Sequence, residues 1–251
     1  MSQHCLAIDI GGTNTKLSIV STQGNFVSEK LIPTTKFPKF DNFCGELKDE
    51  ILQAIHQYTI LGVGIGCPNY NNQSGRIENP PNLPWGTVEI KKILQDKSPV
   101  PIYVEKDAPL AALGEFYFGN HDTNNLAVLT IGTGIGSGFI INGKLHQTPH
   151  GYGSEAGHLI VGAKNYLCGC GGLDHLEAYA SVSALRKKAS ESYGKKVTFT
   201  ELTQLALALD QQAVAIVKEA AYYFAVGISQ IINIVGSQKV ILAGGGTSLG
   251  P

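Results

Sequence analysis

Cysteine and histidine residues with the spacing of metal ligands gather in segment 153–177. Cys168 and Cys170 are separated by one glycine, His175 follows five residues after Cys170, and His158 lies ten residues before Cys168. Two thiolates and two imidazoles form a donor set that holds a tetrahedral zinc ion. The spacing therefore predicts a structural zinc site that ties a glycine-rich loop to the start of the helix that follows it.

Other interpretations of this segment stay open. Free cysteines are often small buried hydrophobic residues, and a single histidine is more often a core or surface residue than a ligand. His146 and His150 are nearby alternatives for the fourth ligand. Glu155 and Glu177 bracket the cluster. Their positions allow both carboxylates to face a common pocket.

A glycine-tipped hairpin near the amino terminus is the second chemical feature. An apolar strand over 5–10 contains Asp9, a turn of Gly11, Gly12 and Thr13 follows, and a second strand runs over 16–21. Backbone N–H groups in such a turn, together with the Thr13 and Thr15 hydroxyls, suit phosphate oxygens. Asp9 suits a magnesium ion held through water. An ordinary β-turn is the alternative interpretation.

The same plan recurs about 120 residues later, where a strand over 127–131, the sequence GTGIGSG and a strand over 139–141 follow one another. This recurrence indicates an internal duplication, in which two hairpins grip one nucleotide from both sides. A third glycine turn, Gly244–Gly246, follows a strand over 239–243 and could lie against an adenosine.

Asp107 stands where a strand over 101–105 gives way to a helix over 108–117, in which Pro109 is tolerated near the start. Asp107 is a candidate general base, although a helix cap is the commoner role for an aspartate in this position. The loop 69–85 is rich in asparagine and proline and offers Asn82 and Trp85 for hydroxyl recognition. The remaining pattern predicts a strand over 61–67 and helices over 42–58, 87–97 with Thr87 as cap, 176–192, 200–209 and 211–235.

Size and composition set further bounds. At 251 residues and 26.7 kDa the chain can bury a sizeable core, and its length favours two lobes, placed at 1–117 and 118–251. A net charge of -1 without a basic run makes nucleic acid an unexpected partner. The five cysteines are scattered, and the amino terminus lacks a signal-peptide pattern. Polar residues interrupt the apolar stretch 220–235. Together these features favour a soluble cytoplasmic protein that does not cross a membrane.

The chain resembles the ROK sugar kinases, particularly their glucokinase branch, over nearly its whole length. The motifs are DIGGT at 9–13, GIGCP at 64–68, NPPNLPW at 79–85, ALGE at 112–115, LTIGTGIGSGFIING at 129–143, EAGH at 155–158, CGCGG at 168–172, LEAYAS at 176–181 and GGG at 244–246. The resemblance implies an actin-like, ribonuclease-H-like two-domain α/β fold, with ATP, Mg²⁺ and the sugar meeting between the lobes. It also implies a homodimer.

Residue roles follow from the resemblance. Asp107 matches the catalytic base that takes the proton from the 6-hydroxyl of the sugar. Glu155, His158 and Glu177 match residues that hold other sugar hydroxyls, and His158 would also bind zinc. The residues assigned to the sugar pocket are completed by Asn82 and Lys106, and those assigned to the nucleotide are Asp9, Gly11, Gly12, Thr13, Lys16, Gly132, Thr133, Gly134, Gly136, Gly244 and Gly245.

Four departures from the family pattern matter. Lys106 stands where the family usually has an asparagine, and it can donate hydrogen bonds but not accept them. Pro109 replaces an asparagine, and Asp174-His175 replaces Gly-Cys, an exchange that keeps a zinc ligand at His175. The family usually continues some tens of residues beyond the last glycine turn, whereas this sequence ends at Pro251, so we expect an incomplete nucleotide lobe.

Three functions compete. The first is an ATP-dependent hexokinase of the glucokinase type. The second is a non-catalytic sugar sensor, because repressors of the family keep the EAGH and cysteine region; the early position of the first hairpin predicts no DNA-binding domain before it. The third is a kinase for another sugar, such as N-acetylmannosamine, N-acetylglucosamine or fructose, which Lys106 leaves open.

Overall fold

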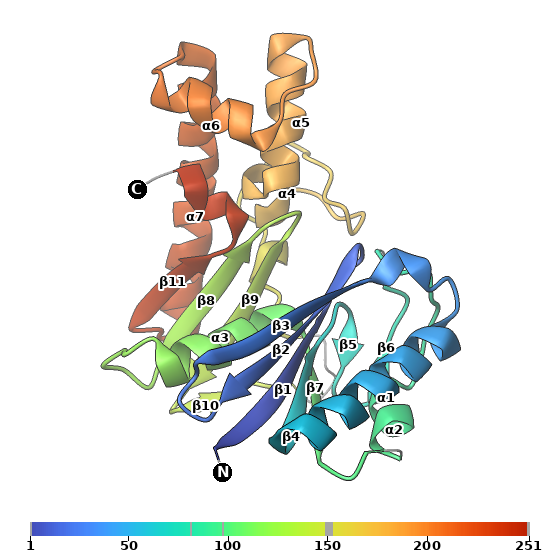
Figure 1. Cartoon of the computed structure of the whole chain (residues 1–251). Coiled ribbons are helices and arrows are strands. Elements are labelled where there is room, and N and C mark those ends of the chain that lie inside the picture. Colours follow the sequence, from blue (N-terminus) through green and yellow to red (C-terminus); the bar gives the residue numbers. More distant parts are fainter. Residues whose placement is uncertain (1, 81, 97, 149–152, 250–251) are drawn as a thin grey trace. The chain divides into compact units, whose positions relative to one another are not determined.

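The computed structural model describes residues 2–80, 82–96, 98–148 and 153–249 (Figure 1). The chain divides into two compact units, which are described in turn. Unit 1 comprises residues 1–110 and 147–153, and unit 2 comprises residues 111–146 and 154–251. The division falls inside helix α3 (Asp107–Phe118), whereas the sequence places the boundary after residue 117.

Unit 1 contains a five-stranded sheet with one apolar face. Its order is β3 (Phe26–Pro33), β2 (Asn14–Ser21), β1 (Gln3–Ile10), β4 (Thr59–Gly66) and β7 (Ile102–Glu105). The first three strands are antiparallel, and β4 and β7 run parallel to β1 and to each other. Exposed and buried residues alternate along all of β1, so one face of the sheet faces the core. Helix α1 (Phe40–Gln57) covers this face, with Phe43 and Leu47 packed among Leu6 and Ile8 (Figure 1).

The shorter elements of unit 1 include one correction. They are η1 (Thr34–Lys36), β5 (Tyr70–Asn71), β6 (Arg76–Ile77) and α2 (Ile90–Gln95). The predicted cap at Thr87 is wrong, because α2 begins after Glu89. Val88 instead forms a β-bridge with Ile77, with both backbone hydrogen bonds at 3.0 Å.

Unit 2 repeats the strand plan of unit 1. Its sheet has the order β10 (Lys144–Leu145), β9 (Ile135–Ile141), β8 (Leu126–Ile131) and β11 (Lys239–Ala243). β8 and β9 form an antiparallel hairpin as β1 and β2 do, and β11 runs parallel to β8 as β4 does to β1. This is the topology that an internal duplication predicts.

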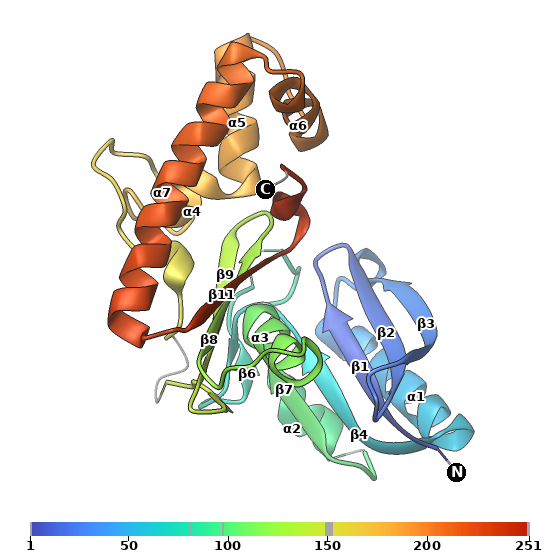
Figure 2. The ribbon, with the colours of Figure 1, turned by 90° about the vertical axis from the view of Figure 1, so that its left-hand side faces the viewer.

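Both faces of the sheet in unit 2 are covered. Leu126 and Val128 pack against Ala112 of α3, while Ala127 and Leu129 face the core formed with the later helices. Those elements are η2 (Ala156–His158), α4 (Leu176–Ala180), α5 (Val182–Tyr193), α6 (Phe199–Leu207), α7 (Gln211–Val235) and η3 (Gly245–Leu249) (Figure 2).

Ser181 divides the single helix predicted over 176–192. Its backbone is extended (φ -72°, ψ 157°), and its hydroxyl accepts the Ala184 N–H, so it ends α4 and caps α5. A serine between two helical patterns can act in this way without disturbing the apolar spacing, which explains why periodicity alone joins the two helices.

Helix α7 is long and apolar enough to cross a membrane by length and composition alone. Its buried residues recur every three or four positions and belong to the core of unit 2. They are Ala213, Ile216, Ala220, Phe224, Gly227 and Ile231. This one-sided burial is typical of a helix that packs against a globular core.

Candidate functional site

Carboxylates gather where the parallel strands β1, β4 and β7 of unit 1 end. Asp9 lies opposite Gly66 in the register, Gly66 lies opposite Glu105, and Asp107 follows as the first residue of α3. Burial raises the pKa of Asp9, the negative charge of Asp107 raises it further, and Lys16 opposes both. Asp107 therefore acts electrostatically on Asp9, and the two predicted site residues share one edge of the sheet.

Asp107 also caps α3. Its Oδ1 accepts the Ala108 N–H at 2.8 Å and so satisfies one of the unpaired donors at the start of the helix. An ionised carboxylate has two oxygens and about four acceptor positions. The capping bond is therefore compatible with a second role as a proton acceptor, and it fixes the direction of the side chain.

Two buried residues of this edge, Glu105 and Cys67, are not among the predicted site residues. Glu105 is only 8% exposed, and its two carboxylate oxygens accept the Lys106 N–H at 2.9 Å and the Gln147 amide at 2.7 Å. Cys67 is fully buried, and burial followed by the charges of Asp107, Glu105 and Asp9 raises its pKa. Their positions in the sequence could have indicated both residues, because each stands at the carboxyl end of a predicted strand, and ligands commonly bind at the carboxyl ends of parallel strands.

The first glycine turn lies against the predicted sugar loop. A Cβ atom at Gly12 would lie 2.6 Å from the carbonyl oxygen of Asn82 and 2.9 Å from its Cβ, so only glycine permits this approach. The turn itself is closed by the Gly11 N–H, which donates to the Asn14 carbonyl at 3.0 Å. The Thr13 carbonyl accepts a backbone N–H at 2.9 Å. The structure thus brings Gly11, Gly12, Thr13 and Asn82 together in unit 1.

Two side chains expected at this site, the Thr15 hydroxyl and the Trp85 indole, form hydrogen bonds to other parts of unit 1. Thr15 is fully buried, and its hydroxyl shares a 2.8 Å hydrogen bond with that of Thr34, so its predicted contact with phosphate is wrong. Trp85 is buried against Phe43, and its indole N–H donates to the Phe37 carbonyl at 2.9 Å. Trp85 is therefore a core residue.

Lys16 keeps a position beside the candidate site. It lies opposite Asp9 in the β1–β2 register, and its ammonium pairs with Glu29 at 2.5 Å. The ammonium also lies 5.7 Å from the centre of the Phe26 ring. This partly exposed ion pair holds the lysine along the sheet, from where its charge lowers the pKa of Asp9.

The second glycine hairpin and the third glycine turn meet in unit 2. The Gly132 N–H donates to the Gly134 carbonyl at 2.9 Å, and Thr133 is exposed at the tip. Gly244 has φ +92°, and a Cβ there would lie 2.6 Å from the Ile131 carbonyl oxygen, so the turn beginning at Gly244 packs on the last residue of β8. Of the other residues assigned to the nucleotide, Gly136 pairs with Thr130 within the hairpin and Gly245 begins η3.

The four predicted zinc ligands converge in unit 2. Donor atoms of His158, Cys168, Cys170 and His175 all lie within 4.8 Å of one another. Cys170 Sγ is 3.2 Å from His175 Nδ1, and Cys168 is buried. Burial raises the pKa of the Cys168 thiol to about 12. Two sulfurs and two nitrogens at this separation fit a tetrahedral zinc ion.

Local geometry explains how the cysteine loop folds. The Cys168 N–H donates to the Gly172 carbonyl at 2.8 Å, and the Gly171 N–H donates back to the Cys168 carbonyl at 3.0 Å. Gly171 has φ +90°, which favours glycine, and a side chain at Gly172 would overlap the His175 ring. Of the alternative ligands, His146 is not a member of the group and His150 lies outside the described residues.

Asp174 organises the same loop and was noted in the sequence only as a departure. It is buried, and its carboxylate accepts backbone N–H groups at 3.0, 3.0 and 3.1 Å from the segment 164–166. The Tyr179 hydroxyl also donates to it. The Tyr179 hydroxyl and these N–H groups hold the pKa of Asp174 below its usual range. Asp174 therefore folds the chain back so that His175 can reach the cysteines.

The two glutamates that bracket the cluster differ in environment. Glu155 is exposed and directly precedes η2, which carries His158. Glu177 lies in the first turn of α4, and its two carboxylate oxygens accept the Ile135 N–H at 2.9 Å and the Cys168 thiol at 3.4 Å. Glu177 thus contacts both the glycine hairpin and the cysteine loop.

Family comparison places these features in a known group. The model of the ROK family matches residues 5–249. The chain belongs to the ROK family. Among curated relatives, the ROK chain is 28% identical over 267 residues to a glucokinase of Halalkalibacterium halodurans, covering 98% of this chain and 81% of the relative. It is 32% identical over 207 residues to a xylose repressor of Bacillus spizizenii, covering 78% of this chain and 53% of that protein.

Solved structures confirm the predicted fold class. The ROK hexokinase of Thermus thermophilus has a TM-score of 0.89 at 28% identity, covering 99% of this chain and 84% of that one. A ROK glucokinase of Streptomyces griseus in complex with glucose and AMPPNP has a TM-score of 0.80 at 26% identity, covering 98% and 85%. The ROK chain therefore has the actin-like two-domain α/β fold.

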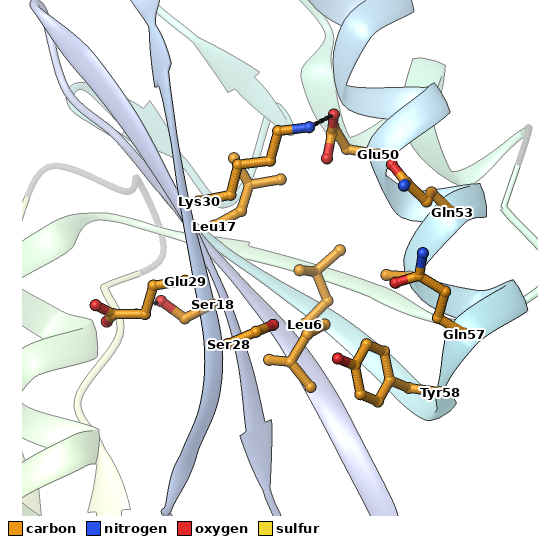
Figure 3. A pocket seen from close by; sticks show the side chains of 12 residues that line it. Leu6, Leu17, Ser18, Ser28, Glu29, Lys30, Glu50, Gln53, Gln57 and Tyr58 are labelled. Atoms are coloured by element: carbon orange, nitrogen blue, oxygen red, sulfur yellow. Dashed lines mark hydrogen bonds and ion pairs between the residues drawn. The ribbon is translucent and has the colours of Figure 1, made fainter.

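A described pocket of about 130 Å³ lies apart from the predicted site residues (Figure 3). It is formed in unit 1 between the outer strands of the sheet and the second half of α1. Lys30 of β3 pairs with Glu50 of α1 at its rim, and Leu6 and Leu17 form an apolar floor. None of the residues that line it is among those assigned to the sugar or the nucleotide, so we do not place the ROK site there.

Proposed function

We propose that this chain is an ATP-dependent hexokinase that phosphorylates the 6-hydroxyl of a hexose, with glucose as its sugar. The glucokinase and hexokinase relatives, matched over almost the whole chain, make it a sugar kinase. The observation that carries the proposed chemistry is the placement of Asp107 beside Asp9 at the carboxyl ends of parallel strands. This edge supplies both a proton acceptor and a group suited to magnesium.

Asp107 acts as the general base in this proposal. Its carboxylate takes the proton from the 6-hydroxyl as that oxygen attacks the terminal phosphate of ATP. Phosphoryl transfer depends mainly on positioning and on neutralising charge, and a general base typically adds about 10²–10⁴-fold. The capping bond to the Ala108 N–H holds the carboxylate in one orientation, which favours this role.

Asp9 is the residue that we assign to magnesium, which it would hold through water. A bound magnesium ion supplies positive charge that offsets the phosphate charge during transfer. Partial burial and the nearby charge of Asp107 raise the pKa of Asp9, and both disfavour its ionised form. A cation is the natural partner of such a group.

Backbone N–H groups of the two glycine turns, other than the Gly11 and Gly132 N–H groups that close the turns, bind the phosphates in this proposal. Gly11, Gly12 and Thr13 form the turn of unit 1, with Lys16 beside it, and Gly132, Thr133, Gly134 and Gly136 form that of unit 2. Glycine turns leave N–H groups exposed to anions, and fixed donors stabilise developing charge. Gly244 and Gly245 are assigned to the nucleoside. The AMPPNP complex of the Streptomyces griseus relative supports ATP as the donor.

Five residues are assigned to the sugar in this proposal. In unit 1 they are Asn82, held against the glycine turn, and Lys106; in unit 2 they are Glu155, His158 and Glu177. Because Lys106 can only donate, it would favour a sugar group that accepts a hydrogen bond at its position. This residue is the main reason to test sugars other than glucose.

Zinc has a structural role in the proposal. His158, Cys168, Cys170 and His175 would hold it, and when bound it ties the cysteine loop to the turn that carries His158. One ring nitrogen of His158 would bind the metal and the other would face the sugar, so the metal orients the pocket. The convergence of the four donors supports this assignment.

A sugar sensor is the second candidate, because the similarity to a xylose repressor extends over 78% of this chain. A sensor would bind sugar without transferring phosphate. The carboxylates Asp9 and Asp107 favour catalysis, since sugar binding alone does not require a magnesium ligand.

We further place the protein in the cytoplasm, where its five free cysteines would stay reduced, and propose a homodimer.

The experiment that tests the function is a coupled assay of ADP release with ATP and a panel of sugars. We expect release with glucose and slower release with N-acetylmannosamine, N-acetylglucosamine and fructose. Sugar binding measured by calorimetry without any ADP release would favour the sensor. Faster release with one of the other sugars would contradict the assignment of glucose.

A further inference from the structure

Glu177 connects the cysteine loop to the second glycine hairpin. It follows His175 by two residues, at the start of α4. One carboxylate oxygen accepts the Ile135 N–H at 2.9 Å, at the point where the hairpin turn becomes β9, and the other accepts the Cys168 thiol at 3.4 Å. The Ile135 contact joins the start of α4 to the hairpin, two segments 42 residues apart in the sequence. It does not depend on the Cys168 thiol, which would no longer donate once it bound zinc as a thiolate.

The same carboxylate explains the glycine at position 134. A methyl group added at Gly134 would overlap Oε2 of Glu177, whereas one added at Gly132 would meet no atom within 4 Å. The absence of a side chain at Gly134 leaves the space that the Glu177 carboxylate fills. A side chain at this position would push the flexible end of Glu177 aside and disturb its bond to the Ile135 N–H, independently of any approach by phosphate.

Further contacts hold the hairpin from the same side. The Val182 N–H, at the start of α5, donates to the Gly132 carbonyl at 2.9 Å. Gly157 of η2 packs so closely on the Ile135 carbonyl that a side chain there would overlap it. The Ala156 N–H donates to the Ser137 hydroxyl at 2.8 Å. The conformation of the turn thus depends on the segment that carries the metal ligands.

We propose that Glu177 is a positioning residue that fixes turn 132–136, so that N–H groups of the turn other than those of Gly132 and Ile135 are held for the phosphates of a nucleoside triphosphate. This inference rests on the proposed function, because it assigns that turn to ATP. It adds a role that a contact with sugar alone would not provide. Loss of the carboxylate frees the Ile135 N–H and opens space beside Gly134, so the turn loses its fixed geometry and nucleotide affinity falls.

Binding of AMPPNP to the full chain tests this role by calorimetry. Glu177→Ala should raise the Kd for AMPPNP about tenfold, the loss expected for one hydrogen bond to a charged group. Glu177→Gln should stay within about threefold, because its amide oxygen still accepts the Ile135 N–H. Zinc content and thermal unfolding, measured on each variant, show whether the fold is kept. An unchanged Kd in Glu177→Ala, with only sugar binding weakened, overturns the proposal.

A double-mutant cycle tests the contact more sharply. Gly134→Ala alone should weaken AMPPNP binding, but in the Glu177→Ala background the added methyl has space, so the two effects should not add. The pair Gly132→Ala and Glu177→Ala is the matched control, in which effects should add because Gly132 does not contact the carboxylate. Additive effects in the Gly134 cycle contradict the proposal.

Hydrogen exchange separates this inference from the function on which it rests. In nucleotide-free protein, Glu177→Ala should speed exchange of the Ile135 amide, whatever the turn binds. The exchange of the Ile135 amide could be faster in Glu177→Ala while the unmodified protein fails to bind AMPPNP. That result would contradict the proposed function and the role in nucleotide binding, but the hydrogen bond between Glu177 and Ile135 would stand. Unchanged exchange would remove the contact itself and with it the inference.

Discussion

The negative charge of Asp107 adds to burial in raising the pKa of Asp9. The two carboxylates belong to different elements, since Asp9 lies in β1 and Asp107 begins α3. A like charge nearby disfavours the ionised form of a carboxyl, so a cation bound at this edge would stabilise both carboxylates. This relationship is the basis for assigning proton transfer and magnesium to the same edge of the sheet.

Removal of the Asp107 charge should lower the pKa of Asp9. We expect Asp107→Asn to shift the acid transition of the Asp9 carboxyl to lower pH, because only burial and Lys16 then act on it. Carboxyl ¹³C NMR titration measures the change. Asp41→Asn is the matched control, since Asp41 lies in the first turn of α1 and is not among the charges that shift Asp9. An Asp9 pKa that is unchanged in Asp107→Asn would remove the electrostatic contact.

Gly12→Ala should disturb the sugar loop. Its methyl would lie 2.6 Å from the Asn82 carbonyl oxygen, so either the turn or the loop must move. We expect kcat/KM for the sugar to fall by about tenfold or more, as misplacement of binding groups typically costs. Gly64→Ala is the control in the same sheet, because a Cβ there meets nothing within 4 Å. Equal activity of the two variants would contradict the close contact.

One zinc ion per chain should bind to the Cys and His cluster. Elemental analysis should give about one zinc per chain for the unmodified protein, and His175→Ala should lower the content because it removes one of four donors. His175→Cys should keep the zinc content of the unmodified protein, since a thiolate binds zinc as well as an imidazole does. His146→Ala, outside the cluster, should keep full zinc content. Absence of zinc from unchelated protein would show that the cluster is not a zinc site.

Acid should remove the stabilising effect of the α7 cap. Asp210 Oδ1 accepts two N–H groups of α7 at 3.0 Å, and the Tyr193 hydroxyl also donates to Asp210. The Tyr193 hydroxyl, followed by the backbone N–H groups, lowers the pKa of Asp210. Because folding lowers the pKa of Asp210, its carboxylate stabilises the fold at pH values above its pKa in the unfolded chain, which is about 3.9. This stabilisation is lost as the pH falls through the pKa of Asp210 in the folded chain.

The corresponding measurement is urea unfolding of the wild type, Asp210→Ala and Asp210→Asn between pH 7 and pH 3.5. The difference between the urea midpoints of the wild type and Asp210→Ala should be largest at pH 7 and should shrink toward the acid end of the range. Asp210→Asn should lose less stability than Asp210→Ala, because asparagine also caps helices. A gap of constant size across this pH range would contradict the sign of the shift.

Several elements were predictable because their signals are local. The first hairpin, β11 over 239–243 and α7 over 211–235 lie at or near their expected positions, since glycine turns and apolar periodicity act within a few residues. The four metal ligands were also found from spacing. Strand β3 was not predicted, because as an edge strand its residues are mostly exposed and carry no alternating pattern.

The errors depend on contacts between distant residues. Thr15 faces Thr34 across the β2–β3 region, and Trp85 packs on α1, so neither side chain is available to a ligand. Glu105 and Asp174 are buried carboxylates, and each accepts hydrogen bonds from a distant segment, Gln147 for Glu105 and residues 164–166 for Asp174. Burial of this kind is a property of the folded chain, and residue type alone does not reveal it.

The most direct test of the account is the turnover of Asp107→Asn with glucose and ATP in the ADP-release assay. Asparagine keeps the size of the side chain and its capping oxygen but cannot accept the hydroxyl proton. We predict a fall in kcat of about 10²–10⁴-fold, with glucose binding still measurable by calorimetry. A wild-type rate in this variant would contradict the assignment of Asp107 as the general base.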